Sequence, residues 1–377
     1  MNYIYFDHAS TTKLDARVLE KMLPYLQNCY GNANSLHYFG RQAVKGLDEA
    51  REIVASLLGA NFNEVYFTSG GTECDNWALN GLLKGENKQK IVISSIEHSA
   101  MLATVNSLKA SGTQVDFVKP NASGFVSVTD FENLVDDKTL CALMLANNEI
   151  GTIQPVKEVA NLVHSKGGVI YTDAVQAMPA LNVNVKDLGV DMLGFSAHKF
   201  NGPKGVGCAY IKNGLKISPL ISGGHQERSL RAGTSNVAGA IGLAYALKFT
   251  RENLESDAKF VLDLRNYFID KVLSEVPSSH LNGSKENRLP NNANILFNGV
   301  SGDSLLYQLD LNGVSASLGA ACSAGSIEPS HVLKEIGLTD SEAFSSLRFT
   351  FGKENTKEEV DKAVTVLKQS VLKLQNN

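Results

Sequence analysis

The chain has 377 residues, of which 43% are hydrophobic and 20% charged, and its formal net charge is -4. This length predicts one large domain with a smaller one beside it, because a single hydrophobic core rarely grows so far. No long run of Lys or Arg is present, which argues against direct binding to nucleic acid or to a membrane surface.

The sequence also lacks the usual signals for export and membrane insertion. Residues 1–7 have neither the basic nor the apolar region of a signal peptide, and no apolar run reaches the roughly 18 residues of a membrane helix. The five cysteines form no C-x-x-C pair, which argues against a zinc site. We therefore expect a cytoplasmic protein with free thiols, no metal and no contact with a membrane.

Short apolar runs alternate with helical patterns through the first two thirds of the chain. This alternation predicts an α/β fold with a mainly parallel, seven-stranded sheet and helices on both of its faces. The predicted strands are 65–67, 91–95, 115–118, 140–145, 169–172, 192–195 and 207–211. The predicted helices between and after them include 74–83, 101–110, 156–166 and 236–251.

The pattern changes near residue 252. A long helical stretch, 253–276, is followed by short strand candidates and a final helix. The strand candidates are 294–297, 314–317 and 347–351, and the last helix is 357–374. We predict a large domain of residues 13–257 and a smaller α+β domain made of residues 1–12 and 258–377.

A glycine turn after the first predicted strand is a candidate anion site. Residues 68–73 read Thr-Ser-Gly-Gly-Thr-Glu and lead directly into a helix. A strand, a glycine turn and a helix start present free N–H groups and a positive dipole end to an anion, here through Gly71 and Thr72. The alternative is a simple helix cap at Thr72. The spacing fits neither of the common nucleotide-binding motifs.

Two later strands end in groups suited to a cofactor. Asp173 ends one strand and Gln176 follows it, at the strand end where ligands of open α/β sheets bind. The next strand runs into Ser196, His198 and Lys199, and a lysine at such a rim can form a Schiff base. The alternatives are a turn-forming aspartate and an ordinary surface lysine.

Taken together, the glycine turn, the aspartate and the lysine suggest pyridoxal 5'-phosphate. Asp173 would keep the ring nitrogen protonated, so that the ring accepts electrons. Lys199 would bond covalently to the cofactor. The phosphate would be held by Thr72, Ser196 and His198.

These motifs resemble those of the class V aminotransferase group and, within it, the cysteine desulfurases of the NifS/IscS type. The similarity extends over nearly the whole chain. It is carried by residues 5–12, 68–73, 97–98, 147–151, 173–176, 196–199 and 231–234, the loop around Cys322, and Arg348. The resemblance implies a fold-type I pyridoxal-phosphate enzyme.

The resemblance also implies roles for four further residues. His98 stacks on the cofactor ring and takes part in proton transfer, and Asn148 and Gln176 approach the phenolic oxygen of the ring. Thr234 reaches the phosphate from a neighbouring subunit, which implies a homodimer. The alternatives are a hydrogen-bonded core histidine at His98 and a loop-forming role for Asn148.

Two residues define the expected reaction. Cys322 lies among small residues, in a loop that could move its thiol at little steric cost, although a lone cysteine is more often a small buried side chain. By resemblance, Cys322 takes sulfur from L-cysteine as a persulfide and L-alanine is released. Arg348 resembles the arginine that binds the substrate carboxylate, together with Asn148; the alternative is a surface arginine on an edge strand.

The sulfur would then pass to a protein partner. The long interval from Cys322 to Arg348 resembles the branch of the family that serves iron–sulfur scaffold proteins or tRNA-thiolation partners. Two other interpretations remain open at this point. One is another pyridoxal enzyme of the same fold, such as an aminotransferase or a selenocysteine lyase. The other is a non-catalytic docking protein.

Overall fold

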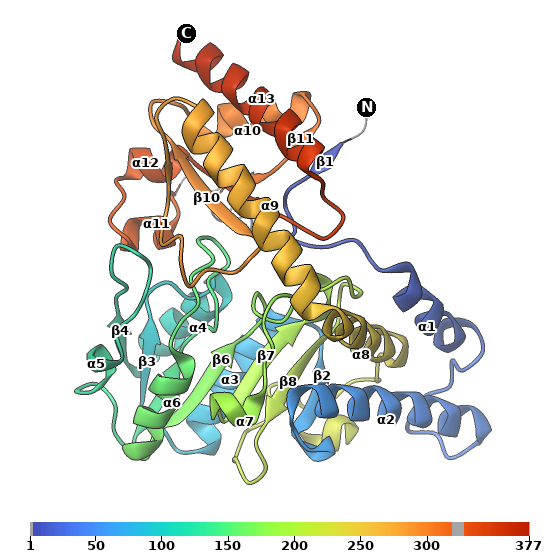
Figure 1. The fold of residues 1–377 in the computed structure, drawn as a ribbon. Coiled ribbons are helices and arrows are strands. Elements are labelled where there is room, and N and C mark those ends of the chain that lie inside the picture. The colour runs from blue at the N-terminus through green and yellow to red at the C-terminus, as the bar shows by residue number, and fades with distance from the viewer. Residues whose placement is uncertain (1–2, 319–327, 377) are drawn as a thin grey trace.

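The computed structural model describes residues 3–318 and 328–376. Its largest unit is a seven-stranded sheet in which the central strands run parallel and β8 runs antiparallel to both of its neighbours (Figure 1). In spatial order the strands are β2 (Val65–Thr68), β8 (Gly207–Ile211), β7 (Met192–Ser196), β6 (Val169–Asp173), β5 (Thr139–Ala142), β3 (Lys90–Ser94) and β4 (Gln114–Val118). All seven strands coincide with predicted ones to within three residues, and the predicted α/β class is confirmed.

Helices cover both faces of this sheet. They are α1 (Ala16–Gln27), α2 (Tyr38–Leu58), α3 (Gly71–Gly85), α4 (Ser99–Ala110), α5 (Val128–Phe131), α6 (Val156–Ser165), α7 (Val185–Leu188) and α8 (Val237–Glu252). Because side chains alternate along a strand, Ile91 and Ile93 pack in one core with α3 and α4. Val92, between them, packs in the opposite core with residues of α1, α2, α6 and α8.

The C-terminal part of the chain builds a separate core around a four-stranded sheet. Its strands, in spatial order, are β12 (Ser317–Leu318), β13 (Ser346–Thr350), β10 (Asn292–Phe297) and β9 (Ser279–Leu281). Its helices are α9 (Leu254–Glu275), α10 (Gly302–Leu311), α11 (His331–Glu335), α12 (Asp340–Phe344) and α13 (Lys357–Gln375). Figure 1 shows α9 and α13 side by side over this part, with α9 leading up from α8.

The N-terminus joins the C-terminal core rather than the large sheet. Strand β1 (Ile4–Tyr5) pairs in parallel with β11 (Val314–Ser315). The buried side chains of Ile4 and Phe6 pack with residues of α9, β10, β13 and α13. The predicted boundaries at residues 12 and 258 stay predictions, and the second of them falls inside α9.

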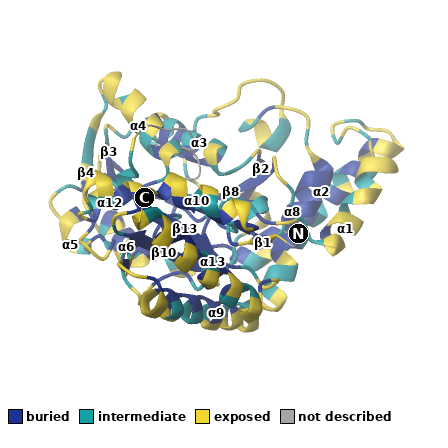
Figure 2. Cartoon of the chain, turned by 90° about the horizontal axis from the view of Figure 1, so that it is seen from above, coloured by how far each residue is buried: buried dark blue, intermediate teal, exposed yellow. Residues whose placement is uncertain are grey.

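Helices α1 and α2 were not predicted from the sequence. Helix α2 begins after His37, whose Nδ1 accepts a hydrogen bond from the Gly40 N–H, and ends at Gly59 in the left-handed region (φ 70°). The helix buries Ala50, Val54 and Leu58 against the sheet, while the loop before it is exposed at one end of the molecule (Figure 2). Among the described residues, no helix is both long and apolar enough to cross a membrane.

Candidate active site

Ten of the twelve predicted site residues line one cavity of about 500 Å³. Strands β6 and β7 run parallel, so their carboxyl ends, Asp173 and Ser196, reach the same edge of the sheet. Helix α3 starts at this edge, directly after β2. The cavity is lined by nine of the predicted cofactor residues, Gly71, Thr72, His98, Asn148, Asp173, Gln176, Ser196, His198 and Lys199, and by Arg348.

Two predicted site residues are not among the described residues that line the cavity. Thr234 is absent from the lining of this cavity within its own chain. Cys322 lies outside the described residues, so its predicted role stays a prediction. The described residues on either side of it in the sequence do lie at the site, because Ser317 pairs with Arg348 and Glu328 lines the cavity.

Asp173 is a buried carboxyl at the cavity wall. Its Oδ1 accepts a hydrogen bond from the Val175 N–H (2.8 Å), as a turn-forming aspartate would, and the residue also lines the cavity. Burial raises the pKa of Asp173 above its ordinary value, while the nearby His98 and Lys199 oppose the rise. A cationic partner in the cavity would therefore favour the ionised carboxylate.

Lys199 is half-buried rather than a surface lysine. It ends the short 3-10 helix η2 (Ala197–Lys199) that follows β7. Its Nζ donates to the carbonyl oxygens of Ala9 (2.7 Å) and Ser10 (2.9 Å). The amine is thus held at the cavity wall by backbone groups from the start of the chain.

His98 and Asn148 both line the cavity. His98 is the N-cap of α4, and its Nδ1 accepts from the Ala100 N–H (3.2 Å), so a neutral ring carries its proton on Nε2. Asn148 Oδ1 is buried and has no hydrogen-bond partner within the described part of the chain. The unpartnered Asn148 Oδ1 is therefore a polar atom suited to a ligand.

The glycine turn contributes Gly71 and Thr72 to the lining of the cavity. Gly70 is the N-cap of α3 and supplies no side chain, so Thr72 lies inside the first turn and the predicted capping alternative is wrong. A Cβ on Gly71 would come within 2.7 Å of Val175 Cγ2, which leaves little room for a side chain.

His198, which also lines the cavity, has a lowered pKa. Burial, with the nearby Lys199 and Lys204, lowers the pKa of His198 to about 4. His198 is therefore neutral near pH 7.

An ion pair that was not predicted from the sequence supports this turn. Glu73 receives two hydrogen bonds from Arg231, from Nε (2.7 Å) and Nη2 (3.0 Å), and one from the Ser69 N–H (2.8 Å). Burial alone would raise the pKa of Glu73, but the bonds from Arg231 and Ser69 lower it below the ordinary value. Arg231 lies three residues before Thr234, so the pair ties the turn to the segment that carries Thr234.

Arg348 is not a surface arginine on an edge strand. Its strand, β13, lies between β12 and β10, and the residue is only 1% exposed. Nη1 donates to the Asn148 carbonyl (2.9 Å), and Nη2 donates to Asp7 Oδ1 (3.1 Å) and Ser10 Oγ (2.8 Å). Nε is buried and has no partner among residues 3–318 and 328–376, so a donor remains available to a ligand.

Two further buried acids line the cavity and were not predicted as site residues. Asp75 accepts a hydrogen bond from the Tyr171 hydroxyl (2.7 Å), and burial followed by the charge of Asp173 raises its pKa well above the ordinary value. Glu149 accepts from the Ser330 hydroxyl, and burial raises its pKa as well. In the sequence, Glu149 lies inside the recognised motif 147–151 and Asp75 lies two residues after the motif 68–73, and these positions were the only signal for either residue.

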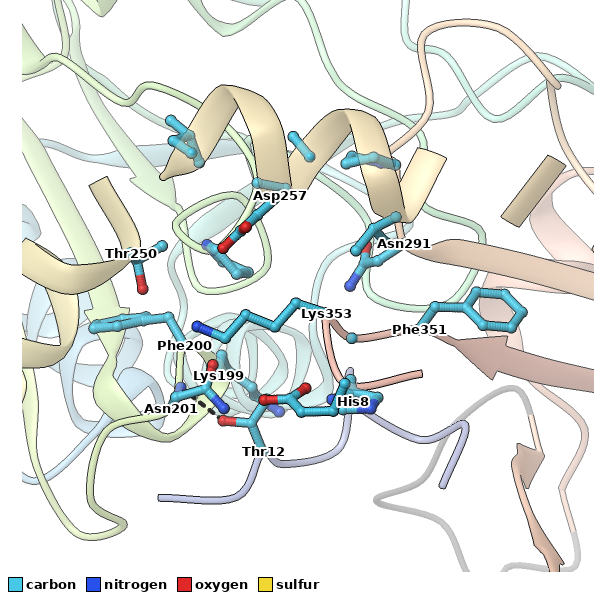
Figure 3. Close-up of a pocket in the computed structure, with 18 residues that line it drawn as sticks. His8, Thr12, Lys199, Phe200, Asn201, Thr250, Asp257, Asn291, Phe351 and Lys353 are labelled. Carbon is cyan, nitrogen blue, oxygen red and sulfur yellow. Dashed lines mark hydrogen bonds between the residues drawn. The ribbon is translucent and has the colours of Figure 1, made fainter. Parts of the chain in front are cut away.

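A smaller cavity of about 80 Å³ lies on another side of Lys199 (Figure 3). Thr250 of α8 and Asp257 of α9 lie on one side of it, and His8 and Thr12 lie on the other. The Thr12 hydroxyl accepts a hydrogen bond from the Asn201 N–H (2.7 Å). Its volume is too small for a cofactor, so the larger cavity is the candidate active site.

The larger cavity fits pyridoxal phosphate. It joins a lysine amine, a buried carboxyl suited to a protonated ring nitrogen, a helix start suited to a phosphate, and the unpartnered Asn148 Oδ1. These groups define a pyridoxal-phosphate enzyme of the α/β class.

Comparison with known proteins gives the same class and a narrower family. Residues 4–363 match the family model described as aminotransferase class-V. The chain is 44% identical over 369 residues to the cysteine desulfurase IscS of Clostridium botulinum, covering 97% of this chain and 93% of that protein. It is also 44% identical over 375 residues to the cysteine desulfurase IscS of Dictyoglomus turgidum, covering 98% and 95%.

Solved structures agree with the sequence comparison. A NifS-like protein superposes with a TM-score of 0.91 at 38% identity, covering 97% of this chain and 98% of that one. SspA in complex with cysteine superposes with a TM-score of 0.83 at 33% identity, covering 94% and 100%. The chain belongs to the cysteine desulfurase family within the class V aminotransferases.

Proposed function

We propose that this protein takes sulfur from L-cysteine, releases L-alanine and carries the sulfur as a persulfide on Cys322. The observation that supports this most is the single cavity that holds both the predicted cofactor groups and the buried Arg348. Membership of the cysteine desulfurase family supports the same reaction.

Pyridoxal phosphate, when bound, would supply an electron sink for the carbon atoms of the substrate. Asp173 would face its ring nitrogen, and His98 would lie against its ring. Gln176 and Asn148 would approach the phenolic oxygen. The phosphate would be held by Gly71, Thr72, Ser196 and His198, with Thr234 added by a second subunit.

Lys199 would move the proton of the substrate Cα. Its Nζ is held at the cavity by bonds to the carbonyls of Ala9 and Ser10, and in its neutral form the amine would act as the base. Arg348 would hold the substrate carboxylate through its buried guanidinium and fix the Cα near that amine.

Cys322 would act as the nucleophile. A new sulfur–sulfur bond forms between its thiolate and the substrate sulfur, the carbon–sulfur bond breaks, and its electron pair stays with the carbon, which is protonated to give alanine. Cys322 lies four residues after Leu318 in the sequence, a span of at most about 14 Å. Because Leu318 pairs with Leu347, next to Arg348, this reach is compatible with the cavity.

The other cysteines are poor candidates for this role. Cys74, Cys141 and Cys208 are fully buried, and burial raises the pKa of each thiol. Cys29 is partly exposed, follows α1 and is not among the residues that line the cavity. These positions support the assignment of the nucleophile to Cys322.

The homodimer remains part of the proposal. A group of large apolar side chains is exposed on α1, at the start of α2 and in the loop between them, a pattern typical of an interface. The group comprises Leu19, Leu23, Leu26, Tyr30, Leu36, Tyr38 and Phe39. Leu36 is 92% exposed, and a second copy of the chain would remove it from water.

The sulfur acceptor is proposed by its chemistry alone. An iron–sulfur scaffold protein or a tRNA-thiolation protein would take the persulfide sulfur, since the loop length resembles that branch of the family. A cytoplasmic location stays a prediction.

The reaction is tested by incubating the purified protein with pyridoxal phosphate and L-cysteine and measuring alanine and sulfide. We expect a yellow protein that forms alanine and, with a thiol reductant, releases sulfide. The Cys322→Ser variant should stay yellow and lose sulfide release. Unchanged activity in that variant would instead favour an aminotransferase, and a protein that never binds the cofactor would favour a docking role.

A further inference from the structure

Residues 7–12, here called the N-terminal strap, connect the C-terminal sheet to the catalytic lysine. At the first end of the strap, the Ala9 N–H donates to Thr350 Oγ1 of β13 (2.9 Å). At its other end, Thr12 donates to the His198 carbonyl through both its N–H (2.9 Å) and its hydroxyl (2.8 Å). The strap therefore lies between the strand that carries Arg348 and the turn that carries Lys199.

On the arginine side, the strap forms a connected set of hydrogen bonds. The Ser10 hydroxyl donates to Asp7 Oδ1 (2.8 Å) and accepts from Arg348 Nη2 (2.8 Å). The same Nη2 also donates to Asp7 Oδ1 (3.1 Å). Because a guanidinium is planar, these bonds fix the orientation of the plane in which a carboxylate would be bound.

On the lysine side, the strap acts through its backbone. The carbonyls of Ala9 and Ser10 both accept from Lys199 Nζ, and the Ala9 carbonyl also accepts from Gln176 Nε2 (2.9 Å). Ser10 therefore contacts Arg348 through its side chain and Lys199 through its carbonyl.

We propose that Ser10 is a positioning residue that orients Arg348 for the substrate carboxylate. The strap at the same time holds Arg348 and Lys199 in a fixed position relative to each other. This inference rests on the proposed roles of Arg348 and Lys199. Loss of the Ser10 hydroxyl removes one of the two acceptors of Nη2 and leaves the charge of the site unchanged. The carboxylate site loosens as a result, and the lysine side keeps both carbonyl contacts.

The test compares two ligands on the holoenzyme. 3-Mercaptopropionate has the carboxylate and thiol of cysteine without the amine, and cysteamine has the amine and thiol without the carboxylate. In Ser10→Ala we expect the affinity for 3-mercaptopropionate to fall about tenfold, the scale of one hydrogen bond to a charged group. The affinity for cysteamine should stay unchanged, and KM for L-cysteine should rise with kcat within about twofold.

Two further variants complete the test. Ser127→Ala removes an exposed hydroxyl that does not line the cavity, and this variant should behave as the wild type. Ser10→Thr keeps the hydroxyl and should bind 3-mercaptopropionate nearly as well as the wild type, even if Ser10→Ala does not fold. Equal weakening of both ligands, or wild-type binding of 3-mercaptopropionate by Ser10→Ala, would overturn the role of Ser10. If the wild type itself binds no cofactor, the proposed function fails instead.

Discussion

The two walls of the active-site cavity are built in different ways. On the large sheet, Asp173 and Ser196 end neighbouring parallel strands and Lys199 follows within three residues, so one local topology delivers all three. On the C-terminal side, Arg348 depends on Asp7, Ser10 and Asn148, which lie far away in the sequence. The first part, here called the sheet wall (Asp173, Ser196 and Lys199), is thus built by one continuous sheet. The second part, here called the substrate wall (Arg348 and its partners), forms only when segments far apart in the sequence pack together.

The sheet wall is tested most severely by removing its amine. Lys199→Ala should lower alanine formation at least about 10³-fold, since it removes both the covalent attachment and the proton-transfer group. Borohydride should no longer fix the cofactor to the protein. Lys186→Ala, at an exposed lysine of α7, is the matched control and should retain activity. Activity near the wild-type level in Lys199→Ala would contradict the assignment.

A change in the substrate wall should weaken substrate binding without loss of the cofactor. Arg348→Lys keeps the charge but loses the planar fork, so we expect KM for L-cysteine to rise about 10- to 100-fold while the cofactor colour persists. Steady-state kinetics and absorbance measure the two effects. Arg265→Lys changes another buried arginine that does not line the cavity, and it should leave KM unchanged. If Arg348→Lys lost the colour of the bound cofactor, Arg348 would be needed for cofactor binding as well. The separation between a cofactor-binding and a substrate-binding part of the cavity would then be wrong.

A smaller effect, on cofactor affinity, is expected from the ion pair between Glu73 of the glycine turn and Arg231. Glu73→Gln loses the ion pair with Arg231, and we expect the affinity of the apoprotein for pyridoxal phosphate to fall about three- to tenfold. Absorbance titration with the cofactor measures this. Asp270→Asn, which breaks an exposed pair with Lys285, is the control. Unchanged affinity in Glu73→Gln would show that the turn holds its shape without the pair.

The last prediction concerns the pH dependence of stability, with no change in the chemistry of the site. Glu97 is buried, its Oε1 accepts from the Met144 N–H (2.7 Å), and burial raises its pKa to about 8 from an ordinary value of 4.5. A carboxyl with a raised pKa in the folded state stabilises the fold below the unfolded pKa, and this contribution is lost as pH rises toward the folded pKa. As pH rises from 4.5 to about 8, Glu97 therefore lowers stability by at most about 1.4 kcal/mol per pH unit.

Glu97→Gln should remove this part of the pH dependence. Denaturant unfolding of both proteins at several pH values, with the same cofactor content, should show a shallower decline for the variant. Parallel curves would contradict the raised pKa of Glu97.

Much of the sheet wall was predictable because its signals are local. Strand ends, the glycine turn and the run of residues 196–199 place their groups at one edge of a parallel sheet, and the strand pattern alone predicts that sheet. The roles of Asn148, Arg348 and His98 came from resemblance, and the structure places all three in the same cavity.

The remaining contacts could not be predicted from local patterns. Asp7 and Ser10 reach Arg348 across 341 and 338 residues, and Glu73 meets Arg231 across 158. Such pairs depend on how segments far apart in the sequence pack together, which no periodicity specifies. Helices α1 and α2 contain residues that argue locally against a helix, Pro24 in α1 and Gly40 and Gly46 in α2.

The central claim is that the sulfur of L-cysteine is carried as a persulfide on Cys322. Mass spectrometry of the holoenzyme after brief exposure to L-cysteine, followed by peptide mapping, tests it most directly. The account predicts one added sulfur atom per chain, located on the peptide that contains Cys322. Added sulfur on Cys29, Cys74, Cys141 or Cys208 alone, or none on any cysteine while alanine accumulates, would contradict it.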